Sequence, residues 1–248
     1  MRLTPDVAAA LAEDASTLAI LQDRELTPAM LAELKSLDFP KNFSLLPTDD
    51  AGSKVFGMMR EEVAALPEAA GTAFLDDLAA DFAAIYLTGA FGASPYESYW
   101  LSDDHLICQD AMFDLRTLYS EAGLTVPDWR IRADDHLVFQ LQFLAHQLPK
   151  ADGDEDWRSL AGFLDYHLLR WLLDFASRVA NRCGTPLYAA LALLTDTWCQ
   201  QLRGLIERHL GEVRPTTEEI EERLRAQRMV EALPVPIRFM PGAAGPSW

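Results

Sequence analysis

The chain has 248 residues, half of them hydrophobic, so it can bury a substantial core as one large domain or two small ones. Its formal charge is −17, and residues 1–127 carry 21 acidic but only 7 basic side chains, so the negative charge is concentrated in the N-terminal half. This charge disfavours nucleic-acid and anionic-lipid partners and favours cationic ones, although it also serves solubility alone.

The cysteine pattern and the missing motifs exclude several classes of protein. Cys108, Cys183 and Cys199 form no C-x-x-C pair, which argues against a zinc site and a disulfide framework and fits a reducing cytoplasm. No uninterrupted apolar run of roughly 18 residues is present, and we expect neither a secretory signal nor membrane insertion. Nucleotide-binding and nucleophile-elbow motifs are absent, so the sequence favours binding over catalysis and predicts no cofactor.

Helix start signals recur along the chain. Thr4-Pro5, Thr27-Pro28 and Thr185-Pro186 each place a capping hydroxyl before a proline at the first helical position. Thr216 and Glu219 form a capping-box pattern before a charged segment. The start signals and the apolar spacing together predict helices over residues 5–23, 28–37, 68–87, 106–122 and 134–148. A further helix is predicted to begin after Thr185.

The strongest apolar periodicity lies in the second half. Apolar residues at steps of three and four from Leu160 to Val179, with His167 among them, predict one face of a single long helix, and His167 is expected to be a hydrogen-bonded core histidine. The pattern from Leu187 to Leu202 predicts the next helix.

Strand signals are nearly absent, so we predict an all-α globular bundle of about eight to ten helices. Glycine and proline punctuate residues 38–53 and 89–104. The expected organisation is an N-terminal helical part (1–126), a C-terminal helical part (127–232) and a Pro/Gly-rich tail (233–248), with the two helical parts possible as subdomains joined by a hinge.

Residues 89–104, here called the aromatic segment, contain the first candidate site. Tyr96, Tyr99 and Trp100 lie within five residues of a predicted loop, next to Glu97 and Leu101. The rings can simply anchor the loop to the core, or they can offer apolar area with hydrogen-bonding tips to a peptide.

Residues 132–140, here called the Asp-His segment, contain the second. Asp134 or Asp135 can cap the predicted helix that follows. Alternatively, Asp135 and His136 form a polar pair facing a groove, with Gln140 one turn further along, ready to meet an arginine or a backbone group of a ligand.

Two rival functions use the same residues. Asp103, Asp104 and His105, with Asp135 and His136, could serve a helical metal-dependent hydrolase, but the Glu-x-x-His signature of di-iron bundles is missing and we expect no metal. The other rival is an acidic helical adaptor that binds a folded partner.

Both segments resemble the TorD/DmsD family of chaperones. Gly92–Trp100, followed by Leu101 to Asp104, is similar to the family's central Pro-aromatic loop. About thirty residues later the family carries Glu-Pro-x-Asp-His, and here Asp135 and His136 match its last two positions whereas Arg132 and Ala133 depart from its Glu and Pro. Residues 163–171 and 185–195 are also similar, so the resemblance covers about residues 81–209.

The resemblance implies an all-helical fold and a cytoplasmic chaperone that is not an enzyme. Members bind the twin-arginine signal peptide of a molybdenum enzyme, such as a trimethylamine N-oxide or dimethyl sulfoxide reductase, and hold the apoenzyme until its cofactor is inserted, which delays export. Monomers and domain-swapped homodimers both occur. The peptide-binding residues expected here are Tyr96, Glu97, Tyr99, Trp100, Leu101, Asp103, Asp104, Asp135, His136 and Gln140.

Overall fold

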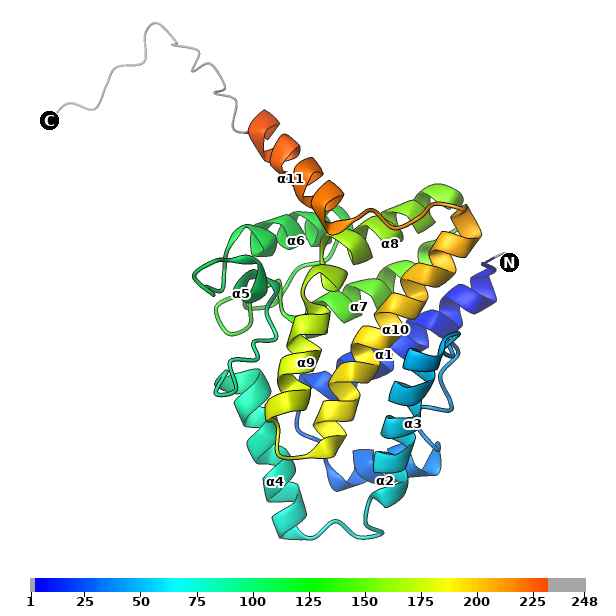
Figure 1. The fold of residues 1–248 in the computed structure, drawn as a ribbon, viewed down its shortest axis with the longest axis vertical. Coiled ribbons are helices and arrows are strands. Elements are labelled where there is room, and N and C mark those ends of the chain that lie inside the picture. Colours follow the sequence, from blue (N-terminus) through cyan, green and yellow to red (C-terminus); the bar gives the residue numbers. More distant parts are fainter. Residues whose placement is uncertain (1–2, 232–248) are drawn as a thin grey trace, which may run out of the picture. The chain divides into compact units, whose positions relative to one another are not determined.

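The computed structural model describes residues 3–231, which form helices and no β-strand (Figure 1). The prediction of an all-α fold is therefore confirmed. Residues up to Arg214 form one compact unit, and those from Pro215 form a second, of which one helix is described. The helices are α1 (Pro5–Asp23), α2 (Pro28–Ser36), α3 (Asp50–Ala65), α4 (Thr72–Phe82), α5 (Glu97–Leu101), α6 (Asp110–Glu121), α7 (Leu137–Gln147), α8 (Asp154–Tyr166), α9 (Leu172–Arg182), α10 (Pro186–Leu210) and, in the second unit, α11 (Thr217–Glu231).

Most of the predicted helix caps form. Thr4 and Thr27 accept hydrogen bonds from backbone N–H groups of the first turns of α1 and α2, at 3.4 and 3.3 Å. The capping box of Thr216 and Glu219 is present in both directions, at 2.9 and 3.2 Å. Thr185 differs from the prediction, because its hydroxyl makes no capping bond.

The Thr185 hydroxyl is instead a donor. It donates to the buried carboxylate of Asp81 at 2.6 Å, and the same carboxylate accepts from the backbone N–H groups of Gly184 and Thr185 at 3.0 and 2.6 Å. Asp81 of α4 thus accepts the hydrogen bonds that the donors of the turn before α10 need, although it lies more than a hundred residues away from that turn in the sequence.

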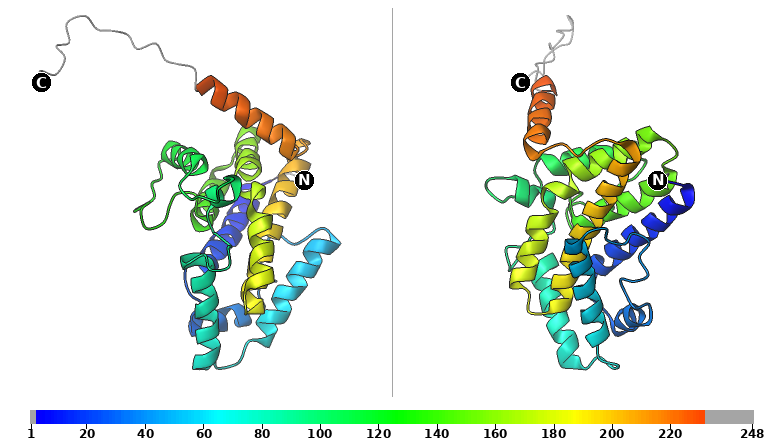
Figure 2. Two further views of the ribbon diagram at one scale, coloured as in Figure 1. Left: turned by 60° about the vertical axis from the view of Figure 1, so that its left-hand side comes forward. Right: turned by 45° about the vertical axis from the view of Figure 1, so that its right-hand side comes forward.

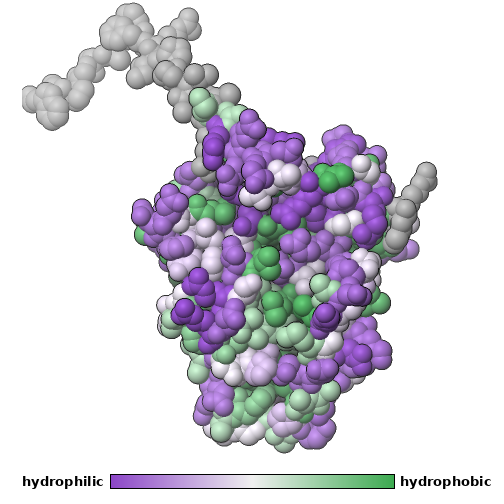
Figure 3. All heavy atoms as spheres, in the orientation of Figure 1, coloured by the Kyte–Doolittle hydropathy of each residue, from purple (hydrophilic) through white to green (hydrophobic). Residues whose placement is uncertain are grey.

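The core of the first unit is organised around α10. Its apolar side chains from Leu187 to Ile206 are almost all buried, and Trp198 is completely so. Helices α3, α8 and α9 pack against it, and α1 packs on α7. The views show α9 and α10 side by side and antiparallel (Figures 1 and 2), and hydrophobic residues gather over the middle of this pair on the face drawn in Figure 3.

The single long helix predicted over residues 160–179 was wrong. Helix α8 ends at Tyr166, a 3-10 turn covers Leu168–Arg170, and α9 begins at Leu172. His167, with φ −121° and ψ −91°, is the residue at which the α-helical conformation stops. The apolar faces of both halves still pack on α10, so the periodicity correctly marked what is buried but not the bend between the two helices.

Helix α3 lies where no helix was predicted. Asp49 caps it by accepting from the Gly52 N–H at 2.7 Å, and Phe56, Met59 and Val63 are its buried apolar residues. Two glycines and several charged residues weakened the apolar signal, and packing on α10 supplies what local propensity does not. Among the described residues, no helix has the length and apolar character that crossing a bilayer requires.

Candidate functional site

The fold brings the two candidate segments together, and the aromatic segment lies against the Asp-His segment. An isolated antiparallel bridge pairs Tyr96 with His136. The Glu97 N–H donates to the Asp135 carbonyl at 3.1 Å, and the Leu137 N–H donates to the Pro95 carbonyl at 2.8 Å. These bonds join the start of α5 to the start of α7, so the two segments form one structural junction.

Asp135 caps a helix, but not the one that follows it. Its Oδ2 accepts from the backbone N–H of Ser98 in the first turn of α5 at 2.9 Å, and the side chain is completely buried. Its Oδ1 has no hydrogen-bond partner among the described residues. Burial raises the pKa of this carboxyl, and hydrogen bonds from Ser98 oppose that rise.

His136 caps α7, a role that the sequence assigned to Asp134 or Asp135. Its Nδ1 accepts from the Val138 N–H at 3.1 Å, so the ring hydrogen lies on Nε2, which is buried without a partner among the described residues. Burial, and then the nearby charge of Arg132, lower its pKa to about 3. The ring is therefore neutral at physiological pH and packs edge-on against Tyr96, with centroids 4.9 Å apart.

A buried hydrogen bond ties the junction to the bend between α8 and α9. Glu97 is completely buried, and its Oε1 lies 3.0 Å from His167 Nδ1. His167 is the buried, hydrogen-bonded core histidine that was predicted. Gln140 is also buried, and its Nε2 donates to the Asp135 carbonyl at 3.0 Å.

The rings of the aromatic segment are only partly covered by the rest of the protein. Tyr96, Tyr99 and Trp100 are each half-buried. Trp100 donates its indole N–H to the Ser94 carbonyl at 2.8 Å, and Tyr99 stacks on His105 with centroids 4.8 Å apart. The rings therefore both anchor the segment and keep part of their surface exposed.

Arg178, on α9, covers Trp100. Its guanidinium carbon lies 5.6 Å from the indole centroid, and its Nη1 donates to the Gly92 carbonyl at 3.2 Å. Gly92 has φ +60°, and a side chain there would begin 3.1 Å from that same nitrogen. Sequence reasoning did not identify Arg178, because it lies 86 residues from Gly92 with no motif around it.

The structure divides the predicted peptide-binding residues into three groups. Glu97, Asp135, His136 and Gln140 are buried inside the junction; Tyr96, Tyr99, Trp100 and Leu101 are half-buried; Asp103 and Asp104 are exposed. Asp135 and His136 therefore differ from the expectation that they face a groove, because they satisfy α5 and α7 instead. Direct contact of a peptide with these two side chains stays a prediction, and it requires the junction to open.

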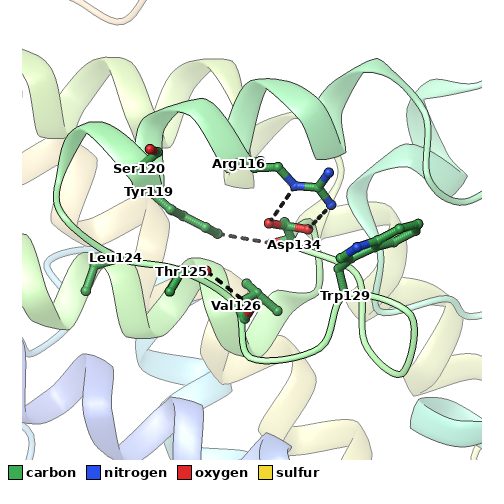
Figure 4. A pocket seen from close by; sticks show the side chains of 8 residues that line it. All are labelled: Arg116, Tyr119, Ser120, Leu124, Thr125, Val126, Trp129 and Asp134. Carbon is green, nitrogen blue, oxygen red and sulfur yellow. Dashed lines mark hydrogen bonds and ion pairs between the residues drawn. The ribbon is translucent and has the colours of Figure 1, made fainter.

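A pocket of about 190 Å³ is lined by Asp134, by residues of α6 and by the loop that follows α6 (Figure 4). The sequence did not predict this pocket. Asp134 binds Arg116 through two hydrogen bonds at 2.8 and 3.2 Å, and the Tyr119 hydroxyl donates to its carbonyl. The guanidinium of Arg116 also lies over the ring of Trp129, 5.2 Å from the centroid, at the edge of the pocket. Trp129, a tryptophan between two predicted helices, is a sequence feature that could have indicated it.

No group of three potential metal ligands comes together within the described part of the chain. The carboxylates of Asp103 and Asp104 and the ring of His105 are exposed, whereas Asp135 and His136 are buried. The geometry that a metal-dependent hydrolase would need is not formed by the residues that the rival interpretation named.

Known proteins resemble this chain over the same region. The family described as "Nitrate reductase delta subunit" matches residues 57–177. A chaperone protein TorD of Shewanella loihica is 28% identical over 181 residues, which cover 71% of this chain and 82% of the relative. One from Vibrio cholerae is 34% identical over 133 residues, covering 50% of this chain and 60% of the relative. One from Escherichia coli O45:K1 is 28% identical over 182 residues, covering 71% and 86%.

The matched region contains both segments of the junction, together with the buried partner His167. The relatives are named as chaperones. The order of the two segments, their pairing in the fold and these similarities agree: over the region that contains the junction, the chain is similar to chaperone proteins named TorD and to the family described as "Nitrate reductase delta subunit".

Proposed function

We propose that this protein is a cytoplasmic chaperone that binds the twin-arginine signal peptide of a molybdoenzyme precursor of the trimethylamine N-oxide or dimethyl sulfoxide reductase type. By holding the precursor, it assists cofactor insertion and delays export. The observation that carries the proposal is the half-buried set of rings at Tyr96, Tyr99 and Trp100, next to the buried junction.

The rings suit the apolar part of such a peptide. A rigid aromatic side chain loses little conformational freedom on binding and offers a large apolar area, which is why Tyr and Trp are frequent anchors in interfaces. Because α5 is capped from Asp135 and held by His167, the rings are presented in one arrangement before the peptide arrives. This preorganisation lowers the entropic cost of binding.

The exposed carboxylates suit the two arginines. Asp103 and Asp104 directly follow α5 and are open to solvent, so they can meet a guanidinium without any rearrangement. Glu97 and Asp135 are committed to His167 and Ser98 and become available only if the junction opens. The net charge of −17 also predicts faster association with a cationic peptide at low salt.

Calorimetric titration of the full chain tests the proposal. The ligand is a twin-arginine signal peptide from a candidate precursor, and the matched control is the same peptide with both arginines replaced by lysines. We expect the arginine peptide to bind at least tenfold more tightly, because lysine cannot form the bidentate contacts of a guanidinium. Equal affinity, or no binding of either peptide, would contradict the proposal.

Co-purification adds a second test at the level of the partner. The proposal requires an unprocessed molybdoenzyme precursor bound to the chaperone, in either a monomeric or a domain-swapped dimeric form. Recovery of only processed enzyme, without its signal peptide, would favour the acidic-adaptor alternative. Sedimentation of the isolated complex would distinguish the two oligomeric forms.

A further inference from the structure

We infer that the face of Trp100 and the carbonyl of Gly92 form a guanidinium-binding subsite, which Arg178 fills in the free protein and an arginine of the signal peptide takes over. The inference rests on the proposed function for the identity of the ligand. The subsite itself rests on an observed occupant, because the protein's own guanidinium is bound there.

The contacts of Arg178 are those that specify a guanidinium rather than an ammonium. A planar, delocalised cation can cover the indole face and donate in its own plane to a carbonyl at the same time. The Gly92 carbonyl is accessible because this residue has φ +60° and no side chain, and a Cβ there would meet Arg178 Nη1 at 3.1 Å. The subsite is therefore shaped by a glycine and a tryptophan from the same aromatic segment.

Arg178 is held weakly for a cation in so acidic a protein. Among the described residues, its contacts are the Trp100 ring and the Gly92 carbonyl, without an ion pair to a carboxylate. By contrast, Arg116, Arg132 and Arg203 each pair with an aspartate. A contact of this kind contributes little, so a guanidinium delivered by a peptide anchored on the neighbouring rings can displace it.

The exchange keeps the local charge constant. One guanidinium leaves and another enters, so no charge becomes buried without its partner contacts, and Arg178, half-buried at the surface of α9, can turn into solvent. Arg178 thus lowers the apparent affinity for the peptide, because the arginine of the peptide can enter only during the fraction of time that the subsite is empty. It acts as a competitor that disfavours ligands without an arginine.

The first experiment compares two substitutions on α9. Arg178→Gln removes the competitor, and Arg182→Gln removes the same charge from an exposed position one turn further along. We expect Arg178→Gln to bind the twin-arginine peptide roughly five- to tenfold more tightly than wild type in calorimetry, as the loss of one cation–π contact and one hydrogen bond predicts. Arg182→Gln should stay within about twofold. An equal effect of both substitutions, or weaker binding by Arg178→Gln, would overturn the inference.

The second experiment separates this inference from the proposed function, because it uses no signal peptide. N-acetylarginine amide is titrated into the Arg178→Gln and wild-type chains while the Trp100 indole N–H resonance is followed by NMR, with N-acetyllysine amide as the control. We expect a saturable shift with the arginine derivative in Arg178→Gln and a much smaller one in wild type. Absence of any shift in a folded Arg178→Gln chain overturns the subsite, whatever the signal peptide does.

Discussion

The two faces of the short helix α5 are built on opposite principles. On the inner face, Glu97 and Ser98 are 0% and 1% exposed and make hydrogen bonds to His167 and Asp135. On the outer face, Tyr99 and Trp100 are half-buried, and Trp100 is covered by the guanidinium of Arg178. Five residues therefore combine a buried polar network with a ring-lined surface.

The difference separates stability from binding. A buried charge or N–H group needs its partner, and removing that partner costs the full desolvation penalty, so the inner face should control the fold. A half-buried ring at the surface loses less when it is removed than a buried polar group does, so the outer face should control affinity more than stability. Substitutions on the two faces can test this separation directly.

The largest effect is expected from His167→Ala on the inner face. It leaves the Glu97 carboxyl buried without its hydrogen-bond partner, so we expect the free energy of unfolding to fall by about 3 kcal/mol. Urea denaturation measures the loss, and His105→Ala, which removes an exposed histidine, is the control with an expected change below about 0.5 kcal/mol. Similar small losses in both variants would show that the network does not stabilise the junction.

The second effect is a pH dependence that originates at His136. Burial lowers the pKa of His136 to about 3 in the folded chain, whereas in the unfolded chain the ring titrates near the ordinary histidine pKa of 6.5. The contribution of the neutral ring to the free energy of unfolding is therefore complete above about pH 6.5. It falls by about 1.4 kcal/mol per pH unit as the pH drops from there toward the pKa of the folded chain.

His136→Asn isolates this contribution, because asparagine can cap α7 but does not titrate. Between pH 6.5 and pH 5, wild type should lose about 2 kcal/mol more than the variant in urea denaturation. His105→Asn, with an exposed ring, should follow wild type. If wild type and His136→Asn lose stability in parallel, the ring is not buried as a neutral group.

On the outer face, Trp100→Ala should act on affinity. We expect the signal peptide to bind about thirtyfold more weakly, a loss of about 2 kcal/mol, with the fold retained. Calorimetry measures the change, and Trp129→Ala is the matched control, since it removes a tryptophan that is 41% exposed beside the pocket of Arg116. A larger loss in Trp129→Ala would move the peptide site to that pocket.

The smallest effect is expected at the exposed carboxylates. Asp103→Asn should weaken peptide binding by about 1 kcal/mol or less, and added salt should reduce the difference further. Asp77→Asn, which removes one exposed charge from α4, serves as the control for net charge. A loss greater than that of Trp100→Ala would reverse the order and remove the assignment of the rings as anchors.

Much of the fold could be predicted from local sequence. The hydroxyl caps of α1 and α2, the buried face of α10 and the absence of strands among residues 3–231 follow from capping chemistry and apolar spacing. The two segments of the candidate site were also recognisable, since their aromatic and Asp-His patterns are unusual at that spacing. Their role in binding a peptide stays a prediction.

What the tertiary structure alone decided is the choice of partners. Asp135 caps α5 rather than α7. Asp81 accepts a hydrogen bond from the Thr185 hydroxyl, and Arg178 donates one to the Gly92 carbonyl. Dozens of residues or more separate the partners in each case. Propensity and capping act within a few residues and can be read from the chain. A buried polar atom takes whichever partner the packed helices bring within reach, and that is fixed only when the helices are in place.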